Sequence, residues 1–329
     1  MNPARKFQMM VLVILLGYCI QSDIQASAPA QLDTVHQSCR PELPTCADFD
    51  AIVFVHGIYG GADTFKNSST GFDWPIEFPP IIQGRQVDVF RLTYTTALLS
   101  WAKGSNPDFQ EVVNAAFAAM TPLRKRQYRS IGFIAHSLGG NIVSTYIVMV
   151  TERLSHPQRS QNAFIITLAT PVLGAQIADL AGEFKSLLGM NDALLASLKN
   201  ENLYLRMLNE FREYENEKSA RYGCRPVHLH AAYEEKYLGP LLVVSPDSAV
   251  KSIGDLTNSP IVGFNLNHVQ IAKPAGTDDP VYQWVMGRVD NEYTRLAVWD
   301  VSRGSAPANR KLCAGMDFIP ERESITGNP

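Results

Sequence analysis

The chain has 329 residues, 46% of them apolar, and its 29 basic and 32 acidic residues leave a formal net charge of −3. This length and apolar content are enough for one sizeable α/β domain with its own core. The charge balance excludes nucleic acid as the main partner, because phosphate binding needs a concentrated basic face. The one dense basic run, residues 124–126, falls at the expected end of a helix, where cations suit the helix dipole, and we expect it to be a solvated cap.

The N-terminus has the pattern of an export signal. Two basic residues precede the apolar run from Met9 to Ile20, and an A-x-A pattern ends at Ala28. We therefore predict a signal peptide over residues 1–28, and an exported mature domain over residues 29–329 that is secreted or reaches a periplasmic or lumenal compartment. The alternative is a membrane-anchored protein with an uncleaved N-terminal segment, although the run is shorter than the roughly 20 residues that span a bilayer.

Four cysteines remain in the mature chain. An even number in a chain expected to enter an oxidising compartment predicts disulfides. We expect Cys39 to pair with Cys46, closing a short loop, and Cys224 to pair with Cys313, tying the tail to the body. The alternative is that they are free buried thiols. No C-x-x-C or Cys/His spacing predicts a zinc site, and we expect no metal and no organic cofactor.

The middle of the chain alternates apolar, β-prone runs with helical patterns. Residues 51–55 read A-I-V-F-V, a continuous apolar run typical of a strand buried on both faces. Alternation of this kind predicts a mostly parallel central sheet flanked by helices, with a ligand crevice beyond the carboxyl ends of the strands. The expected strands cover residues 51–55, 87–92, 131–135, 163–168, 227–233 and 261–264. The expected helices cover residues 107–123 and 138–154.

The loop after the first of these strands reads H-G-I-Y-G-G over residues 56–61. A glycine-rich turn there lets the backbone approach a reaction centre, where N–H groups stabilise the negative oxygen formed in acyl transfer. We assign the oxyanion donors to the N–H groups of Ile58 and of Leu138, which follows the serine described next. The alternative is an ordinary strand-to-helix turn.

Residues 131–141, I-G-F-I-A-H-S-L-G-G-N, carry the strongest functional motif. A strand pattern runs into Ser137, and two glycines then open a helix. At such a turn the serine backbone is strained and its hydroxyl is exposed, so the residues two positions away must be small. Here they are Ala135 and Gly139, and the alanine departs from the usual G-x-S-x-G form. The pentapeptide alone fits an ordinary turn equally well, but the flanking strand and helix patterns favour a nucleophilic serine.

A nucleophilic serine needs a base and an acid. Imidazole titrates near neutral pH, and of the seven histidines His268 is the best candidate, because it follows the last expected strand and comes after the serine. His228 and His230 alternate within a strand pattern and are expected to be structural. The acid should follow that strand, and we choose Glu234, with Asp247 as the alternative. Each carboxylate could instead be a solvated loop residue.

The segment after residue 174 holds apolar residues at helical spacing with charges between them. We predict a helical cap over about residues 175–222 that covers the crevice. An apolar lining favours an acyl or lipid-like ester over a highly charged substrate, and the cap offers a route to peripheral membrane contact. The alternative is that the apolar stripe only packs the cap onto the body.

Several of these segments resemble the α/β-hydrolase superfamily, and most closely the lipase-like serine esterases that include GPI-inositol-deacylase-like proteins. They are F-V-H-G at residues 54–57, A-H-S-L-G-G at 135–140, L-A-T-P-V-L-G at 168–174, N-H-V at 267–269 and K-P at 273–274. The resemblance extends over about residues 52–274 and implies an α/β-hydrolase fold. The chain departs from that pattern at Val172, where histidine is common, and at Asn267, where aspartate is common, and both changes bear on substrate preference.

These features predict an exported serine hydrolase that cleaves carboxylic esters through Ser137, His268 and Glu234 by way of an acyl-enzyme. The expected partner is a small-molecule or lipid ester. The same three residues would serve an acyltransferase or a thioesterase. A non-catalytic binding protein that has kept the hydrolase fold is the competing class.

Overall fold

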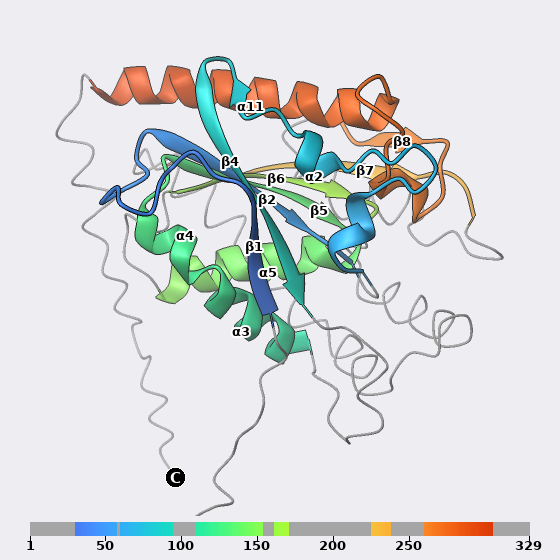
Figure 1. Ribbon diagram of the computed structural model, residues 1–329, viewed down its shortest axis with the longest axis horizontal. Helices are drawn as coiled ribbons and strands as arrows, with labels where there is room; N and C mark the ends of the chain where they lie inside the picture. Colours follow the sequence, from blue (N-terminus) through green and yellow to red (C-terminus); the bar gives the residue numbers. More distant parts are fainter. Residues whose placement is uncertain are drawn as a thin grey trace, which may run out of the picture.

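The structure, a computed structural model, describes residues 30–57, 60–94, 109–153, 161–170, 225–237 and 260–304 (Figure 1). Several predictions fall outside these ranges: the signal peptide at 1–28, the cap at 175–222, and the residues Ile58, Val172, Cys224, Asp247 and Cys313.

The described residues form one eight-stranded sheet in the order β1-β4-β2-β5-β6-β7-β8, with β3 paired to β4. The strands are β1 (Ala30–His36), β2 (Phe49–Val55), β3 (Ile81–Ile82), β4 (Arg85–Tyr94), β5 (Ser130–His136), β6 (Asn162–Leu168), β7 (His228–Glu234) and β8 (Val262–Phe264). The pairs from β4 through β8 are parallel, whereas β1 and β3 lie antiparallel to β4. The prediction of a mostly parallel sheet is confirmed, and every strand expected from the sequence is present with its ends shifted by no more than two residues.

The parallel strands bring distant parts of the sequence to one edge of the sheet, because their carboxyl ends all point the same way. His56 follows β2 and Ser137 follows β5. Glu234 is the last residue of β7, and His268 comes shortly after β8. The topology therefore gathers the residues selected from the sequence before any side-chain contact is considered.

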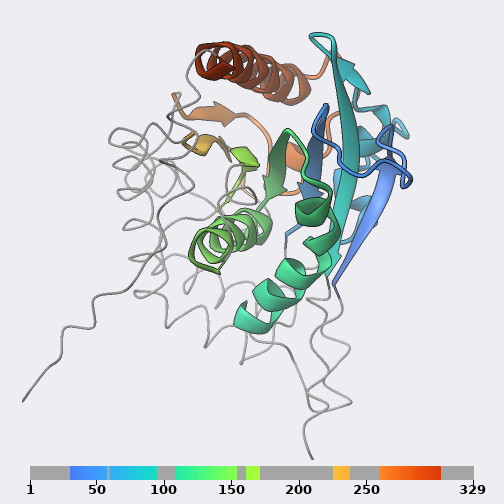
Figure 2. The same ribbon diagram turned by 90° about the vertical axis from the view of Figure 1, so that its left-hand side faces the viewer.

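Helices cover both faces of the sheet (Figures 1 and 2). On one face lie α3 (Phe109–Ala119), α4 (Thr121–Arg126) and α5 (Leu138–Arg153), and on the other lies α11 (Pro280–Gly304). The single helix expected over residues 107–123 is in fact two helices, because Pro122 in the first turn of α4 lacks the N–H needed to continue α3. None of the described helices combines the length and the apolar character needed to span a membrane.

Three short helical turns are also present among the described residues: η1 (Ala62–Phe65), α2 (Trp74–Glu77) and η3 (Gln270–Ala272).

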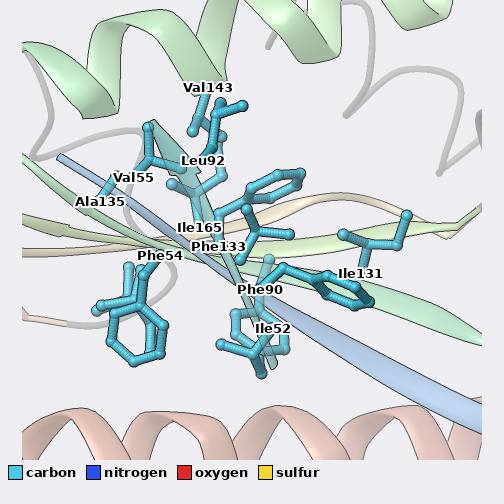
Figure 3. Close-up of a cluster of buried hydrophobic side chains, with 14 of the residues drawn as sticks. Ile52, Phe54, Val55, Phe90, Leu92, Ile131, Phe133, Ala135, Val143 and Ile165 are labelled. Carbon is cyan, nitrogen blue, oxygen red and sulfur yellow. The ribbon is translucent and has the colours of Figure 1, made fainter. Parts of the chain in front are cut away.

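The core lies on both faces of the sheet, and side chains along one strand alternate between them (Figure 3). Val55 and Leu92 lie on the side of α5, whereas Ile52 and Phe54 lie on the opposite side. All four are at most 1% exposed, and full burial of such a side chain contributes about 1.5–3 kcal/mol. The sheet is thus a well-packed base for the edge that carries the candidate site.

Cys39 and Cys46 form a disulfide, as predicted. Arg126 at the end of α4 holds this loop: its guanidinium donates to Cys39 O at 3.1 Å, and its carbonyl accepts from the N–H of Cys46 at 2.6 Å.

The prediction that residues 124–126 form a solvated cap is wrong for Arg124, which is 4% exposed. Its guanidinium lies 4.1 Å from the centre of the Phe117 ring, so an aromatic face takes the place of solvent.

Candidate active site

Ser137 occupies the turn between β5 and α5. Its φ of 53° lies in the left-handed region, which costs a residue with a side chain about 1–2 kcal/mol. Hydrogen bonds from two directions hold it there: its N–H donates to Leu168 O at 2.9 Å, and the hydroxyl of Thr170 donates to Ser137 O at 3.0 Å. Strand β6 and the turn that follows it therefore sustain the strained backbone of Ser137.

Two glycines allow the end of β2 to lie directly against the serine. A methyl group on Gly139 would lie 2.4 Å from His56 O and 2.5 Å from Val55 O. A methyl group on Gly57 would lie 2.6 Å from Ser137 Cβ and 3.1 Å from its Oγ. Carbon contacts are normally about 3.5–4.0 Å, so neither position has room for a side chain. This explains one glycine of each sequence motif, Gly57 after β2 and Gly139 after the serine.

His268 links Ser137 to Glu234. Its Nε2 lies 2.9 Å from Ser137 Oγ, and its Nδ1 lies 3.1 Å from Glu234 Oε1. The three residues are buried, with 6%, 4% and 0% of Ser137, His268 and Glu234 exposed. With the proton on Nδ1, His268 donates to the carboxylate and accepts the serine hydroxyl at Nε2. The structure thus brings together three residues selected separately from the sequence, and Glu234 is the acid that reaches His268 within the described chain.

Of the two expected oxyanion donors, Leu138 is described and Ile58 is not. Leu138 is the first residue of α5, where helix N–H groups have no acceptor within the helix. Its N–H follows Ser137 directly, which is the position an oxyanion donor requires. Gly57, which precedes Ile58, packs against Ser137 as shown above, so the backbone of the second donor segment starts beside the nucleophile.

His56 and Tyr94 fix the start of the turn after β2. Nδ1–H of His56 donates to Gly57 O at 2.7 Å, and its Nε2 accepts from the N–H of Tyr94 at 3.1 Å. The Tyr94 ring stacks on the imidazole with centroids 4.1 Å apart, and its hydroxyl donates to His56 O. Burial lowers the pKa of His56, which keeps it neutral as this pattern requires. Sequence reasoning placed His56 in the turn but missed Tyr94, because no motif marks it.

His136, the residue before the nucleophile, contacts the candidate base. Its Nε2–H donates to His268 O at 2.8 Å, and the two ring centroids are 4.9 Å apart. Burial, together with the nearby His268, holds the pKa of His136 well below its usual range. His136 therefore adds no positive charge beside His268 and acts as a positioning residue. Sequence reasoning had assigned it only to the turn.

The loop that follows His268 is tied to the segment that follows β2. The ammonium of Lys273 donates to Asp63 O at 2.8 Å and to Lys66 O at 3.1 Å. In return, the side-chain amide of Asn67 donates to Lys273 O at 2.9 Å. The K-P motif noted in the sequence thus joins the loop that carries the candidate base to the segment beyond the oxyanion turn.

Metal-ligand spacing occurs among the described residues at a different place. His228 and His230 lie at the start of β7 and Glu292 lies in α11, whereas Glu234 ends β7 at the candidate active site. At the candidate active site, by contrast, Ser137, His268 and Glu234 are joined by direct hydrogen bonds.

A mostly parallel sheet carries a strained serine between β5 and α5, a later histidine that reaches this serine and an acid that reaches the histidine, which is the arrangement of the α/β-hydrolase fold. Residues 111–210 match the family model described as "Putative serine esterase (DUF676)", which confirms the resemblance to serine esterases inferred from the sequence. The matched segment contains Ser137 and ends before Glu234 and His268. The positions of those two residues therefore rest on the geometry of the chain itself.

Solved structures of similar shape include esterases and a thioesterase. A lipase-esterase related protein from Clostridium acetobutylicum is 13% identical, with 80% of this chain and 99% of that chain covered and a TM-score of 0.42. Esterase B from Lactobacillus rhamnosis is 12% identical, with 92% and 96% covered and a TM-score of 0.46. The type II thioesterase BorB from the borrelidin biosynthetic cluster is 15% identical, with 69% and 86% covered and a TM-score of 0.38. At identities this low the likeness carries nothing about substrate. No curated protein matches the chain in sequence.

Proposed function

We propose that the protein is a serine hydrolase that cleaves carboxylic esters through Ser137, His268 and Glu234. The observation that carries the proposal is the continuous hydrogen-bonded chain from the Ser137 hydroxyl through both ring nitrogens of His268 to the Glu234 carboxylate. This arrangement activates a hydroxyl that is otherwise a weak nucleophile at neutral pH. The match of residues 111–210 to a serine esterase family supports the same chemistry.

The first half-reaction forms an acyl-enzyme. Nε2 of His268 accepts the proton as Ser137 Oγ attacks the ester carbonyl carbon, and the carbonyl oxygen becomes negative. The N–H groups of Leu138 and Ile58 are the proposed donors to that oxygen, and loss of one such donor costs about 3–4 kcal/mol of transition-state stabilisation in comparable sites. The tetrahedral intermediate then collapses, and the departing alcohol takes the proton from His268.

The second half-reaction uses the same groups on water. His268 accepts a proton from a water molecule that attacks the acyl carbon, and returns it to Ser137 Oγ as the acid is released. Glu234 is fully buried against Nδ1, where its negative charge stabilises the imidazolium formed in each half-reaction. The ring thus keeps one orientation throughout the cycle.

Acyl or lipid-like esters are the proposed substrates. The helical, partly apolar segment expected over residues 175–222 supports an apolar lining above Ser137 and contact with a membrane surface. Export is proposed as well. The Cys39–Cys46 disulfide supports this, because such bonds persist in oxidising compartments.

Two other functions use the same residues or the same fold. A thioesterase or acyltransferase would form the same acyl-enzyme and differ only in the leaving group or the acceptor. A binding protein would have no reason to keep Ser137 at a φ of 53° in contact with a histidine, since the strain serves no purpose without chemistry.

The test is covalent labelling of the purified mature protein with a fluorophosphonate probe, followed by intact mass and peptide mapping. We expect a single adduct on Ser137, no adduct in Ser137→Ala, and full labelling of the exposed-serine control Ser69→Ala. Absence of labelling in folded protein would favour the binding-protein function. A series of esters of increasing chain length beside matched thioesters, with and without an added alcohol, then separates esterase, thioesterase and acyltransferase.

A further inference from the structure

A cluster of two histidines and one glutamate lies between β7 and α11, outside the candidate active site. Nδ1 of His228 lies 2.8 Å from Glu292 Oε1, and Nε2 of His230 lies 2.9 Å from the same oxygen. The side chains of His230 and Glu292 are 4% and 3% exposed, whereas that of His228 is 18% exposed. Three possible ligand atoms are therefore gathered in a largely buried place, with His228 the most exposed of the three residues.

The fold explains why the three side chains meet. His228 and His230 are two positions apart in β7, so they project from the same face of the sheet. That face is covered by α11, which supplies Glu292 (Figure 1 and Figure 2). The ligand atoms all lie within 4.8 Å of one another, and among the described residues no other trio of histidine, cysteine or acidic side chains is gathered in this way.

Arg295 fixes the orientation of the Glu292 carboxylate. It binds Glu292 Oε2 at 2.6 Å, and also donates to Ala163 O at 3.2 Å, which anchors the guanidinium to β6. The two oxygens of Glu292 therefore have different partners: Oε2 binds Arg295, and Oε1 faces both histidines.

We propose that His228, His230 and Glu292 bind one divalent zinc ion that clamps α11 to β7. Imidazole nitrogens and a carboxylate oxygen are preferred zinc ligands, and bonds of about 2.0–2.2 Å in a tetrahedron place neighbouring donor atoms roughly 3.3 Å apart. The imidazole nitrogens lie 2.8 and 2.9 Å from Oε1, and all three ligand atoms lie within 4.8 Å of one another, so the imidazoles have to shift relative to the carboxylate to admit the ion. Water entering beside the partly exposed His228 completes the coordination, and Arg295 orients the carboxylate from behind.

The ion is structural and takes no part in ester cleavage. His230 precedes Glu234 by four residues along β7, which corresponds to about 13 Å. The site is therefore at the opposite end of the strand from the residues that face Ser137. Its occupancy stabilises the strand that presents the acid without contacting a reacting atom, so it is independent of the proposed function.

The test is Zn²⁺ binding by the full mature chain after chelator treatment, followed by calorimetry and by the absorption of the Co²⁺ form. We expect one ion per chain, a higher thermal midpoint with Zn²⁺, and a cobalt spectrum without thiolate charge-transfer bands. His228→Asn keeps a side-chain N–H near Glu292 but removes the ligand nitrogen, and it should bind at least about tenfold more weakly. His36→Asn, the same substitution at an exposed histidine, should bind as the wild type does.

Glu292→Gln provides a second variant that removes the anionic ligand with little change in shape, and circular dichroism establishes that each variant is folded. Saturable binding that weakens in both His228→Asn and Glu292→Gln, but not in His36→Asn, supports the site. The proposal is overturned if folded wild-type protein takes up no Zn²⁺, if both cluster variants bind with wild-type affinity, or if thiolate bands place the ion on cysteines.

Discussion

Replacing Gly57 by alanine should slow ester turnover while leaving the protein folded. The added methyl group would lie 2.6 Å from Ser137 Cβ, so the turn after β2 has to retreat by about 1 Å to restore an ordinary contact. A displacement of that size at a catalytic centre costs about 100-fold in rate, which corresponds to about 2.7 kcal/mol of activation free energy. The accompanying loss of folding stability should be about 1–3 kcal/mol, the usual cost of an overpacked site.

The matched control is Gly61→Ala in the same loop. Gly61 has an extended backbone, with φ of −174°, and a methyl group there would meet nothing within 4 Å. The assay compares kcat/KM for a short ester and the rate of fluorophosphonate labelling, with thermal unfolding measured in parallel. If Gly57→Ala turned over as fast as Gly61→Ala, the close approach of this turn to Ser137 would have no role in catalysis and the reasoning would be refuted.

Three further predictions test polar groups of the protein. Glu234→Gln should lower kcat by about 10⁴, because an amide favours the wrong imidazole tautomer, whereas Asp247→Asn should turn over normally; the reverse result would assign the acid to Asp247. His136→Phe removes the hydrogen bond to His268 O and should lower kcat about tenfold with KM unchanged, and His136→Gln, which retains a donor, should recover activity. Asp50→Asn should destabilise the fold by about 3–5 kcal/mol at neutral pH, because two arginines would lose their buried partner. Burial raises the pKa of Asp50, but hydrogen bonds from these arginines lower it below 3.8; its stability contribution is therefore complete above pH 3.8 and lost as the pH falls through the lower folded-state pKa. Acid unfolding curves of wild type and Asp50→Asn that differ by the same amount at every pH would contradict this assignment.

The central strands could be predicted because burial on both faces requires a continuous run of apolar residues. Strand β2 is covered on both faces and reads as an unbroken apolar run. Strand β1 was not predicted, because it is partly exposed and its identity as a strand depends on antiparallel pairing with β4, far along the chain. Helix α11 does carry a helical signal that the predictions omitted. Its buried side chains recur three or four residues apart, at Val281, Val285, Val289, Tyr293 and Leu296.

The candidate site was predictable where chain order constrains it. Ser137 has a local motif, and His268 follows from the order of elements in a parallel sheet. The contact between Glu234 and His268 needed coordinates, because it depends on the direction in which the end of β7 turns the carboxylate; Asp247 lies outside the described residues. The contacts that support the site could not be predicted from the sequence either, because they join residues far apart in the chain. Tyr94 meets His56 across 38 residues, and Lys273 meets Asp63 across 210, and neither pair has a sequence signature.

The hydrogen bonds from Ser137 through His268 to Glu234 are made by side chains of the folded chain itself. On the proposed function, the reactivity of Ser137 toward small electrophiles is set by the fold, including the contacts of Lys273 with the segment after β2. Selectivity among esters then has to arise from which molecules reach Ser137 and how long they stay. Variants that change substrate preference should accordingly be found in the segments that border the crevice, and the reaction of Ser137 with a small phosphorylating reagent should be nearly the same in all of them.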